Sequence, residues 1–100
     1  MAEAGRIRID KWLWQARFFK SRTLAADRVA AGAVRVNGQR ISKPAHDVGP
    51  GDVLTFAQGG EVRVVRMIAP GTRRGPAAEA RLLYADLGEL PAAGGPEGAD

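Results

Sequence analysis

Residues 8–25 read RIDKWLWQARFFKSRTLA, and this stretch decides how the chain folds. Apolar residues recur in it at helical spacing, which predicts a first helix over residues 9–20. That helix would bury Trp12, Leu13, Ala16 and Phe19. Ser21 then breaks the pattern and is a favourable N-cap, because its hydroxyl can accept a free backbone N–H. A second helix is therefore predicted from Ser21 to about residue 31, with Gly32 as its C-terminal stop.

After the second helix, the pattern changes to that of short strands. Residues 33–36 and 39–43 flank Asn37-Gly38, a dipeptide that strongly favours a hairpin turn. Two more strands are predicted over 53–56 and 62–68, each preceded by a glycine-containing turn. In the last of them, we expect three side chains to point inward: Val62, Val64 and Met67. The middle of the chain is therefore expected to form a small antiparallel sheet.

The C-terminal part is predicted to form one more short helix. Pro76 suits the first position of a helix, and the apolar face would consist of Ala80, Leu83 and Leu87. From Gly88 onward the chain is rich in Gly, Pro, Ala and acidic residues, which favours disorder. We therefore predict an α+β fold over residues 1–87, with two N-terminal helices packed on a small antiparallel sheet and a short C-terminal helix. Residues 88–100 would form a disordered acidic tail.

Charge is distributed unevenly along the 100 residues. Residues 1–43 hold ten Lys and Arg and three acidic residues, a formal charge of +7. The remainder holds five basic and eight acidic residues, so the net charge falls to +4. A chain polarised in this way should present one positive surface, and polyanions are its obvious partners. The alternative is a solvated surface with no partner.

Several functional classes lack support in the sequence. Cysteine is absent, which excludes disulfides, cysteine-ligated zinc and thiol catalysis. His46 is the only histidine and is expected in a surface loop, so a two-histidine metal site cannot be built. No apolar run is long enough for a membrane span, and residues 1–5 lack the apolar core of a signal peptide. We therefore expect a cytoplasmic protein that is not an enzyme and has no catalytic residue, metal or cofactor.

The junction between the two predicted helices is the strongest candidate site. The free amides at the N-terminus of the second helix carry positive polarity, and Lys20 and Arg22 flank the capping Ser21. An arginine fork also matches the oxygens of a phosphate. The alternative is a plain helix cap with solvated neighbours. Arg35 and Arg40, which flank the hairpin turn, and then Lys43 would extend the same positive face.

Two aromatic residues on the first helix allow more than one interpretation. Trp14 and Phe18 are four residues apart, so their side chains can touch. They lie beside Lys11 on a face that helical geometry turns away from the core. They could stack on RNA bases next to a phosphate contact, or dock a protein partner. They could also pack under the C-terminal helix, against Leu83, Tyr84 and Leu87, which is the interpretation we favour.

Taken together, these motifs resemble the S-four RNA-binding domain, named after small-subunit ribosomal protein four. The resemblance rests on residues 8–25, on Gly32 to Gly38 (GAVRVNG), on Lys43-Pro44 and on Gly51-Asp52. Within that family, the residues Asp10 to Trp14 (DKWLW) are similar to the group of bacterial heat-shock protein fifteen. Two features depart from the pattern. Arg28 stands where an apolar residue is usual, and the C-terminus is short and acidic where that group carries a basic helical tail.

The resemblance implies what the protein binds. It implies binding of structured ribosomal RNA on the free large ribosomal subunit that still carries a stalled peptidyl-tRNA, in rescue or recycling of that subunit under stress. It implies RNA contacts on the two-helix face: Arg8, Lys11, Arg17, Lys20, Ser21, Arg22, Arg35 and Lys43. We expect a monomer. The alternatives are an S-four protein directed at tRNA or another RNA, and a targeting module for an RNA-modifying enzyme on another chain.

Overall fold

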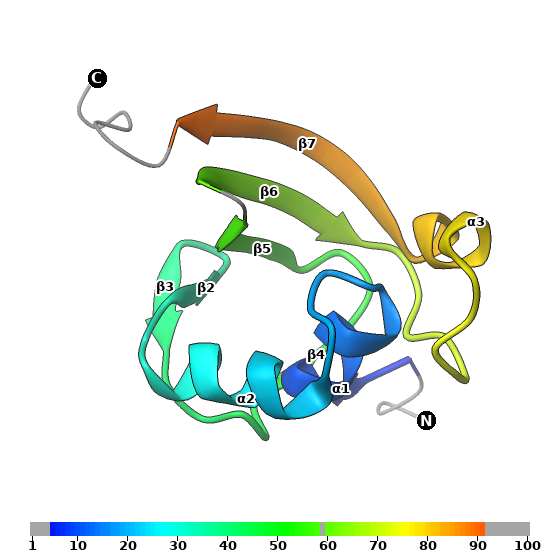
Figure 1. Cartoon of the computed structure of the whole chain (residues 1–100), viewed down its shortest axis with the longest axis horizontal. Helices are drawn as coiled ribbons and strands as arrows, with labels where there is room; N and C mark the ends of the chain where they lie inside the picture. Colours follow the sequence, from blue (N-terminus) through cyan, green and yellow to red (C-terminus); the bar gives the residue numbers. More distant parts are fainter. Residues whose placement is uncertain (1–4, 59, 92–100) are drawn as a thin grey trace.

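The computed structural model describes residues 5–58 and 60–91 and shows the expected α+β architecture (Figure 1). In chain order the elements are β1 (Ile7–Arg8), α1 (Ile9–Gln15), α2 (Arg22–Ala30), β2 (Val34–Val36), β3 (Gln39–Ile41), β4 (Asp47–Val48), β5 (Val53–Gln58), β6 (Glu61–Met67), α3 (Ala77–Ala80), the 3-10 turn η1 (Arg81–Leu83) and β7 (Tyr84–Pro91). The two N-terminal helices lie together on one side of the sheet (Figure 1).

The main sheet is antiparallel and has five strands in the order β3-β2-β5-β6-β7. Asn37 and Gly38 join β2 to β3, and both have positive φ angles, of 52° and 84°. A two-residue turn with that geometry matches the right-handed twist of the flanking strands, so this part of the prediction is confirmed. A second, two-stranded pair of β1 with β4 ties the start of α1 to the loop after the hairpin.

The core lies between the helix pair and the sheet. Trp12 is fully buried, and its indole Nε1–H donates a hydrogen bond to the carbonyl of Ala69 at 2.9 Å. The predicted core residues of the first helix are all buried, as are side chains from α2, β2, β5 and β6: Ala25, Val29, Val34, Val36, Leu54, Phe56, Val65 and Met67. Each of these elements therefore contributes one apolar face, as binary patterning requires.

The first helix is shorter than predicted. It ends at Gln15, not at Lys20, because Arg17 adopts a left-handed conformation with a φ of 67°. The Arg17 N–H then donates to the Trp14 carbonyl and the Phe18 N–H to the Leu13 carbonyl, both at 3.0 Å. This pair of bonds is the Schellman ending of a helix, which usually has glycine at the left-handed position. The chain consequently reverses after Arg17 and sends Phe18 into the core.

The prediction for the C-terminal part was wrong in two respects. The helix stops at Ala80, with Pro76 as its N-cap instead of its first residue, and Leu87 lies half-exposed on β7. Strand β7 pairs with β6 from Met67↔Tyr84 to Glu61↔Pro91, so it crosses the boundary that we placed at residue 88. The rest of the predicted acidic tail, residues 92–100, lies outside the described residues.

The inward phase of β6 also differs from the prediction. Val65 and Met67 are buried, whereas Val62 and Val64 are only partly buried. Successive side chains of a strand point to opposite faces, so Val65 and Met67 share the inner face of β6 while Val62 and Val64 lie on the other one. Met67 is therefore correctly predicted. Among the described residues, no helix is long and apolar enough to cross a membrane.

Candidate nucleic-acid interface

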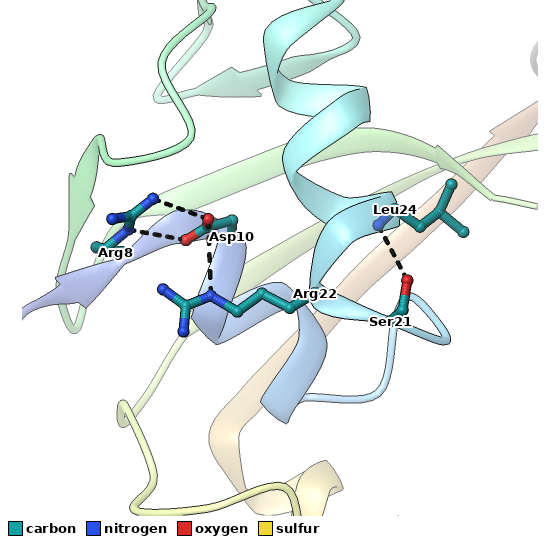
Figure 2. A network of polar contacts seen from close by, with 5 residues as sticks. All are labelled: Arg8, Asp10, Ser21, Arg22 and Leu24. Carbon is teal, nitrogen blue, oxygen red and sulfur yellow. Dashed lines mark hydrogen bonds and ion pairs between the residues drawn. The ribbon is translucent and has the colours of Figure 1, made fainter.

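The junction between α1 and α2 is capped as predicted. The Ser21 hydroxyl oxygen accepts a hydrogen bond from the backbone N–H of Leu24 at 3.0 Å (Figure 2). Ser21 has an extended backbone, with a φ of −138°, and α2 begins at the next residue. Lys20 and Ser21 are exposed, and Arg22 is partly buried. The first turn of α2 therefore presents its positive end beside two cationic side chains.

Asp10 organises the two arginines that the sequence placed on this face. Arg8 donates from Nε and Nη2 to the two Asp10 carboxylate oxygens at 3.1 and 3.0 Å, a bidentate pair. The Nε of Arg22 approaches Asp10 Oδ2 at 3.7 Å from the other side (Figure 2). The Asp10 side chain is only 4% exposed, whereas those of Arg8 and Arg22 are 48% and 42% exposed.

This arrangement brings Arg8 from β1 and Arg22 from α2 together at one point on the surface. A guanidinium has five N–H donors, and Asp10 engages only two of those of Arg8. Both arginines are therefore held in place and keep donors for a second anion. Asp10 was not among the site residues predicted from the sequence. The available signal was an acidic residue between Arg8 and Lys11 in a strongly basic stretch, which indicates that its carboxylate could pair with neighbouring cations.

Lys11, Lys20 and the hairpin cations contribute charge without partners. Lys11 and Lys20 are exposed, and neither makes a hydrogen bond or ion pair within the described part of the chain. Arg35 and Arg40 lie directly opposite each other across β2 and β3, and both are exposed. Like charges in that register repel each other. An anion bound between Arg35 and Arg40 would relieve this repulsion. Lys43, which follows β3, is exposed as well and adds a further positive charge.

Arg17 lies apart from the Asp10 network. Its Nη1 donates a hydrogen bond to the Gly75 carbonyl at 2.8 Å, so the side chain is directed toward the loop before α3. The predicted RNA contacts therefore do not form one cluster. Arg8 and Arg22 converge on Asp10, Arg35 lies on the hairpin beyond α2, and Arg17 lies at the far end of α1.

The aromatic pair is separated by the early end of α1. Phe18 is buried, with its ring centroid 4.6 Å from that of Tyr84 and 4.9 Å from that of Phe56. The packing interpretation is therefore confirmed for Phe18 and its contact with Tyr84. Trp14 is partly buried and is covered by Arg74, whose guanidinium lies 5.8 Å from the ring centroid. Arg74 also donates from Nε to the Trp14 carbonyl at 3.1 Å.

Two further residues differ from their expected environment. Helical geometry places Gln15 on the same outward side as Lys11, but Gln15 is buried, and its Nε2 donates to the Pro70 carbonyl at 3.0 Å. The loop over residues 70–75 covers that side of α1, which helical periodicity alone cannot reveal. Arg28, the departure on α2, is exposed, so it does not interrupt the core.

The comparisons with known proteins agree with this fold. A family model described as the S4 domain matches residues 7–54, the span from β1 into β5. Heat shock protein 15 of Escherichia coli (strain K12) is 47% identical over 83 residues, which are 83% of this chain and 62% of that protein. The chain thus spans less than two thirds of the length of this relative.

Two other matches cover more of the related protein. One is the RQC P-site tRNA stabilizing factor of Bacillus subtilis (strain 168), 38% identical over 61% of this chain and 70% of that protein. The other is a trimeric structure of Vibrio cholerae heat shock protein 15, with a TM-score of 0.77, 41% identity and 81% of each chain covered. Sequence and structure therefore agree that the chain belongs to the S4-domain family, together with the proteins named heat shock protein 15.

Proposed function

We propose that this protein binds structured ribosomal RNA on the free large ribosomal subunit that still carries peptidyl-tRNA. It would act in the cytoplasm, in rescue or recycling of that subunit under stress. The RNA contacts are Arg8, Lys11, Arg17, Lys20, Ser21, Arg22, Arg35 and Lys43. A surface of this kind recognises the shape and phosphates of an RNA helix rather than its base edges, which the deep major groove hides.

The observation that carries the proposal is the surplus of unpaired cations in the first half of the chain. Six of them make no hydrogen bond or ion pair within residues 5–58 and 60–91: Lys11, Lys20, Arg28, Arg35, Arg40 and Lys43. Asp10 pairs with Arg8 and Arg22 and with none of these six. A folded domain that keeps so many cations exposed and unpaired is suited to a polyanionic partner.

The relatives support the choice of RNA. The Bacillus subtilis relative is named for stabilising tRNA in the P site. A match to small ribosomal subunit protein uS4 of Azoarcus sp. (strain BH72), 36% identical over 70 residues, supports the alternative of a different ribosomal RNA target. The Vibrio cholerae relative is described as a trimer, whereas we propose that this chain binds as a monomer. Light scattering of the isolated protein distinguishes these two states.

Sedimentation of the tagged protein through a ribosome gradient after heat stress tests the proposed partner. We expect co-migration with free large subunits that retain peptidyl-tRNA. Co-migration with small subunits, or with soluble tRNA at the top of the gradient, would contradict the large subunit as the partner and favour the alternative RNA targets. A variant that carries both Lys11→Glu and Lys20→Glu provides the control. It should remain folded but no longer co-migrate with the large subunits.

A further inference from the structure

A small pocket lies outside the helix junction, between the end of α1, the segment α3–η1 and the strands β6 and β7. It has a volume of about 220 Å³, and three arginines line it: Arg17, Arg63 and Arg81. Gln58 and Tyr84 contribute further lining. Of the three arginines, only Arg17 belongs to the proposed RNA contacts, so the other two need a separate explanation.

Arg63 forms a fixed cationic wall of this pocket. Its side chain is 15% exposed, and its Nη1 donates to Gln58 Oε1 at 2.8 Å. Its Nη2 donates to Asp86 Oδ2 at 3.0 Å, and its guanidinium lies 5.4 Å from the centroid of the Phe18 ring. Contacts on several sides hold this guanidinium in one position, so a ligand would not need to order it.

Arg17 is kept at a position where glycine would be less strained. Its φ of 67° lies in the left-handed region, which an L-residue other than glycine occupies at a cost. The Gly75 carbonyl engages one nitrogen of its guanidinium, and the remaining donors stay available. A strained backbone that retains an arginine indicates a use for the side chain beyond the helix ending.

Arg81 supplies the available charge. It is exposed on η1 and makes no hydrogen bond or ion pair in the portion of the chain that the structure describes. Asp86 is a carboxylate partner of Arg63, whereas neither Arg17 nor Arg81 forms an ion pair with a carboxylate in the described residues. Arg17 and Arg81 therefore bring guanidinium groups without a carboxylate partner to the hollow that Arg63 also lines.

Size and chemistry together define the ligand. Sites for whole cofactors and similar small molecules usually have volumes of about 300–1,000 Å³, so this pocket is small for one. A phosphate group is compact and accepts the paired donors of arginine forks. Resting on the proposed function, we propose that the pocket binds a backbone phosphate of the same RNA, so that the RNA path extends from the helix pair past the end of α1 onto η1.

The test uses the full chain and an in vitro transcript of large-subunit ribosomal RNA, with affinity measured at several salt concentrations. Each phosphate contact contributes roughly 0.7–0.9 to the slope of log affinity against log salt. Arg81→Ala should lower that slope by about this amount and weaken binding about five- to eightfold at roughly 0.1 M salt. Arg81→Lys should restore part of the loss, because it keeps the charge without the fork.

Arg66→Ala is the matched control. Arg66 is exposed on β6, has no polar partner among the described residues and does not line the pocket. Arg66→Ala removes the same charge as Arg81→Ala. Equal losses of RNA affinity in the two variants would therefore overturn the proposed phosphate site and indicate a general effect of charge. Absence of any loss in Arg81→Ala would overturn it as well. Failure of the unaltered protein to bind the transcript would instead overturn the proposed function.

An NMR titration of the arginine Nε–H resonances separates an RNA phosphate from a free anion. Addition of the transcript should shift the resonances of Arg63 and Arg81 at stoichiometric concentration, whereas inorganic phosphate at the same concentration should leave them in place. Equal shifts with inorganic phosphate would assign the pocket to a free phosphate and contradict the RNA assignment.

Discussion

Asp10→Asn should destabilise the protein through the two arginines that the carboxylate holds. The substitution keeps the size of the side chain but leaves one acceptor oxygen and places an amide N–H₂ group where Arg8 now donates a hydrogen bond or beside the Arg22 guanidinium. The change therefore removes at least one charge-assisted bond and sets donor against donor. The buried position of Asp10, at 4% exposed, prevents water from replacing the lost contact.

The magnitude lies between two reference cases. A hydrogen bond to a charged group contributes about 1.5–3 kcal/mol net, and removal of one partner from a fully buried ion pair costs about 3–5 kcal/mol. Arg8 and Arg22 are nearly half exposed, so they regain water when Asp10 is lost, and the upper range does not apply. We therefore expect a loss of about 2 kcal/mol in the free energy of unfolding, and at least about 1.5 kcal/mol.

Urea denaturation followed by far-ultraviolet circular dichroism measures this loss. With a urea slope of about 1–3 kcal/mol/M, the midpoint should fall by about 0.7–2 M. Asp27→Asn is the matched control, because Asp27 is exposed on α2 and makes no side-chain hydrogen bond or ion pair in the described region. Its effect should stay within about 0.5 kcal/mol. Equal midpoints for the two variants would refute the role assigned to Asp10.

Three more predictions concern single side chains. Ser21→Ala should lower the free energy of unfolding by about 1 kcal/mol in urea denaturation, because the N–H of Leu24 loses its acceptor. Lys20→Glu should weaken binding of a ribosomal RNA transcript in a filter assay more than Arg66→Glu does, with the circular dichroism spectrum unchanged. Arg17→Gly should change the free energy of unfolding by less than about 1 kcal/mol, since relief of the left-handed strain offsets the more flexible unfolded chain, while RNA affinity falls.

Each of these predictions has an outcome that contradicts it. An unchanged stability of Ser21→Ala would show that the cap does not anchor α2. RNA binding that survives Lys20→Glu as well as it survives Arg66→Glu would place the interface on another face. A loss of more than about 2 kcal/mol in Arg17→Gly would mean that the bond to Gly75 dominates the strain of the backbone. Arg22 is not used for charge reversal, because a carboxylate there would face Asp10.

The helix pair and the hairpin could be predicted because local chemistry determines them. Ser21, Gly32 and Asn37-Gly38 each have a physical role that depends only on their own residue type, and the structure places all of them as expected. The end of α1 could not be predicted in this way. The helical spacing of apolar residues continues past Gln15, and arginine at position 17 does not indicate a left-handed backbone.

Long-range pairing explains the error at the C-terminus. Ala80, Leu83 and Leu87 recur at helical spacing, and Ala, Leu and Glu favour helices. The edge of β6 nevertheless offers unpaired backbone groups along its whole length, and β7 pairs with it over residues 84–91. Strand formation of this kind depends on the neighbouring strand more than on intrinsic preference. The same limit applies to Gln15, which the 70–75 loop covers.

The candidate site was predictable in composition but not in arrangement. Charge counting identified the basic first half, and the helix cap identified its centre. The approach of Arg22 to the Arg8–Asp10 pair depends on the packing of α1 against α2, and the pocket brings Arg17 together with Arg63 and Arg81, which lie more than 40 residues later in the chain. The Arg8–Asp10 pair is local and could have been suspected from the sequence, whereas the approach of Arg22 and the assembly of the pocket arise from tertiary packing.

The salt dependence of RNA binding tests the central claim most directly, namely that exposed cations of the first half grip RNA phosphates. If about five phosphates are neutralised, log affinity plotted against log salt should have a slope of about −3.5 to −4.5, at roughly 0.7–0.9 per phosphate. Lys11→Glu and Lys20→Glu together should make that slope shallower. A flat salt response of the unaltered protein would contradict the phosphate grip and with it the account of this surface.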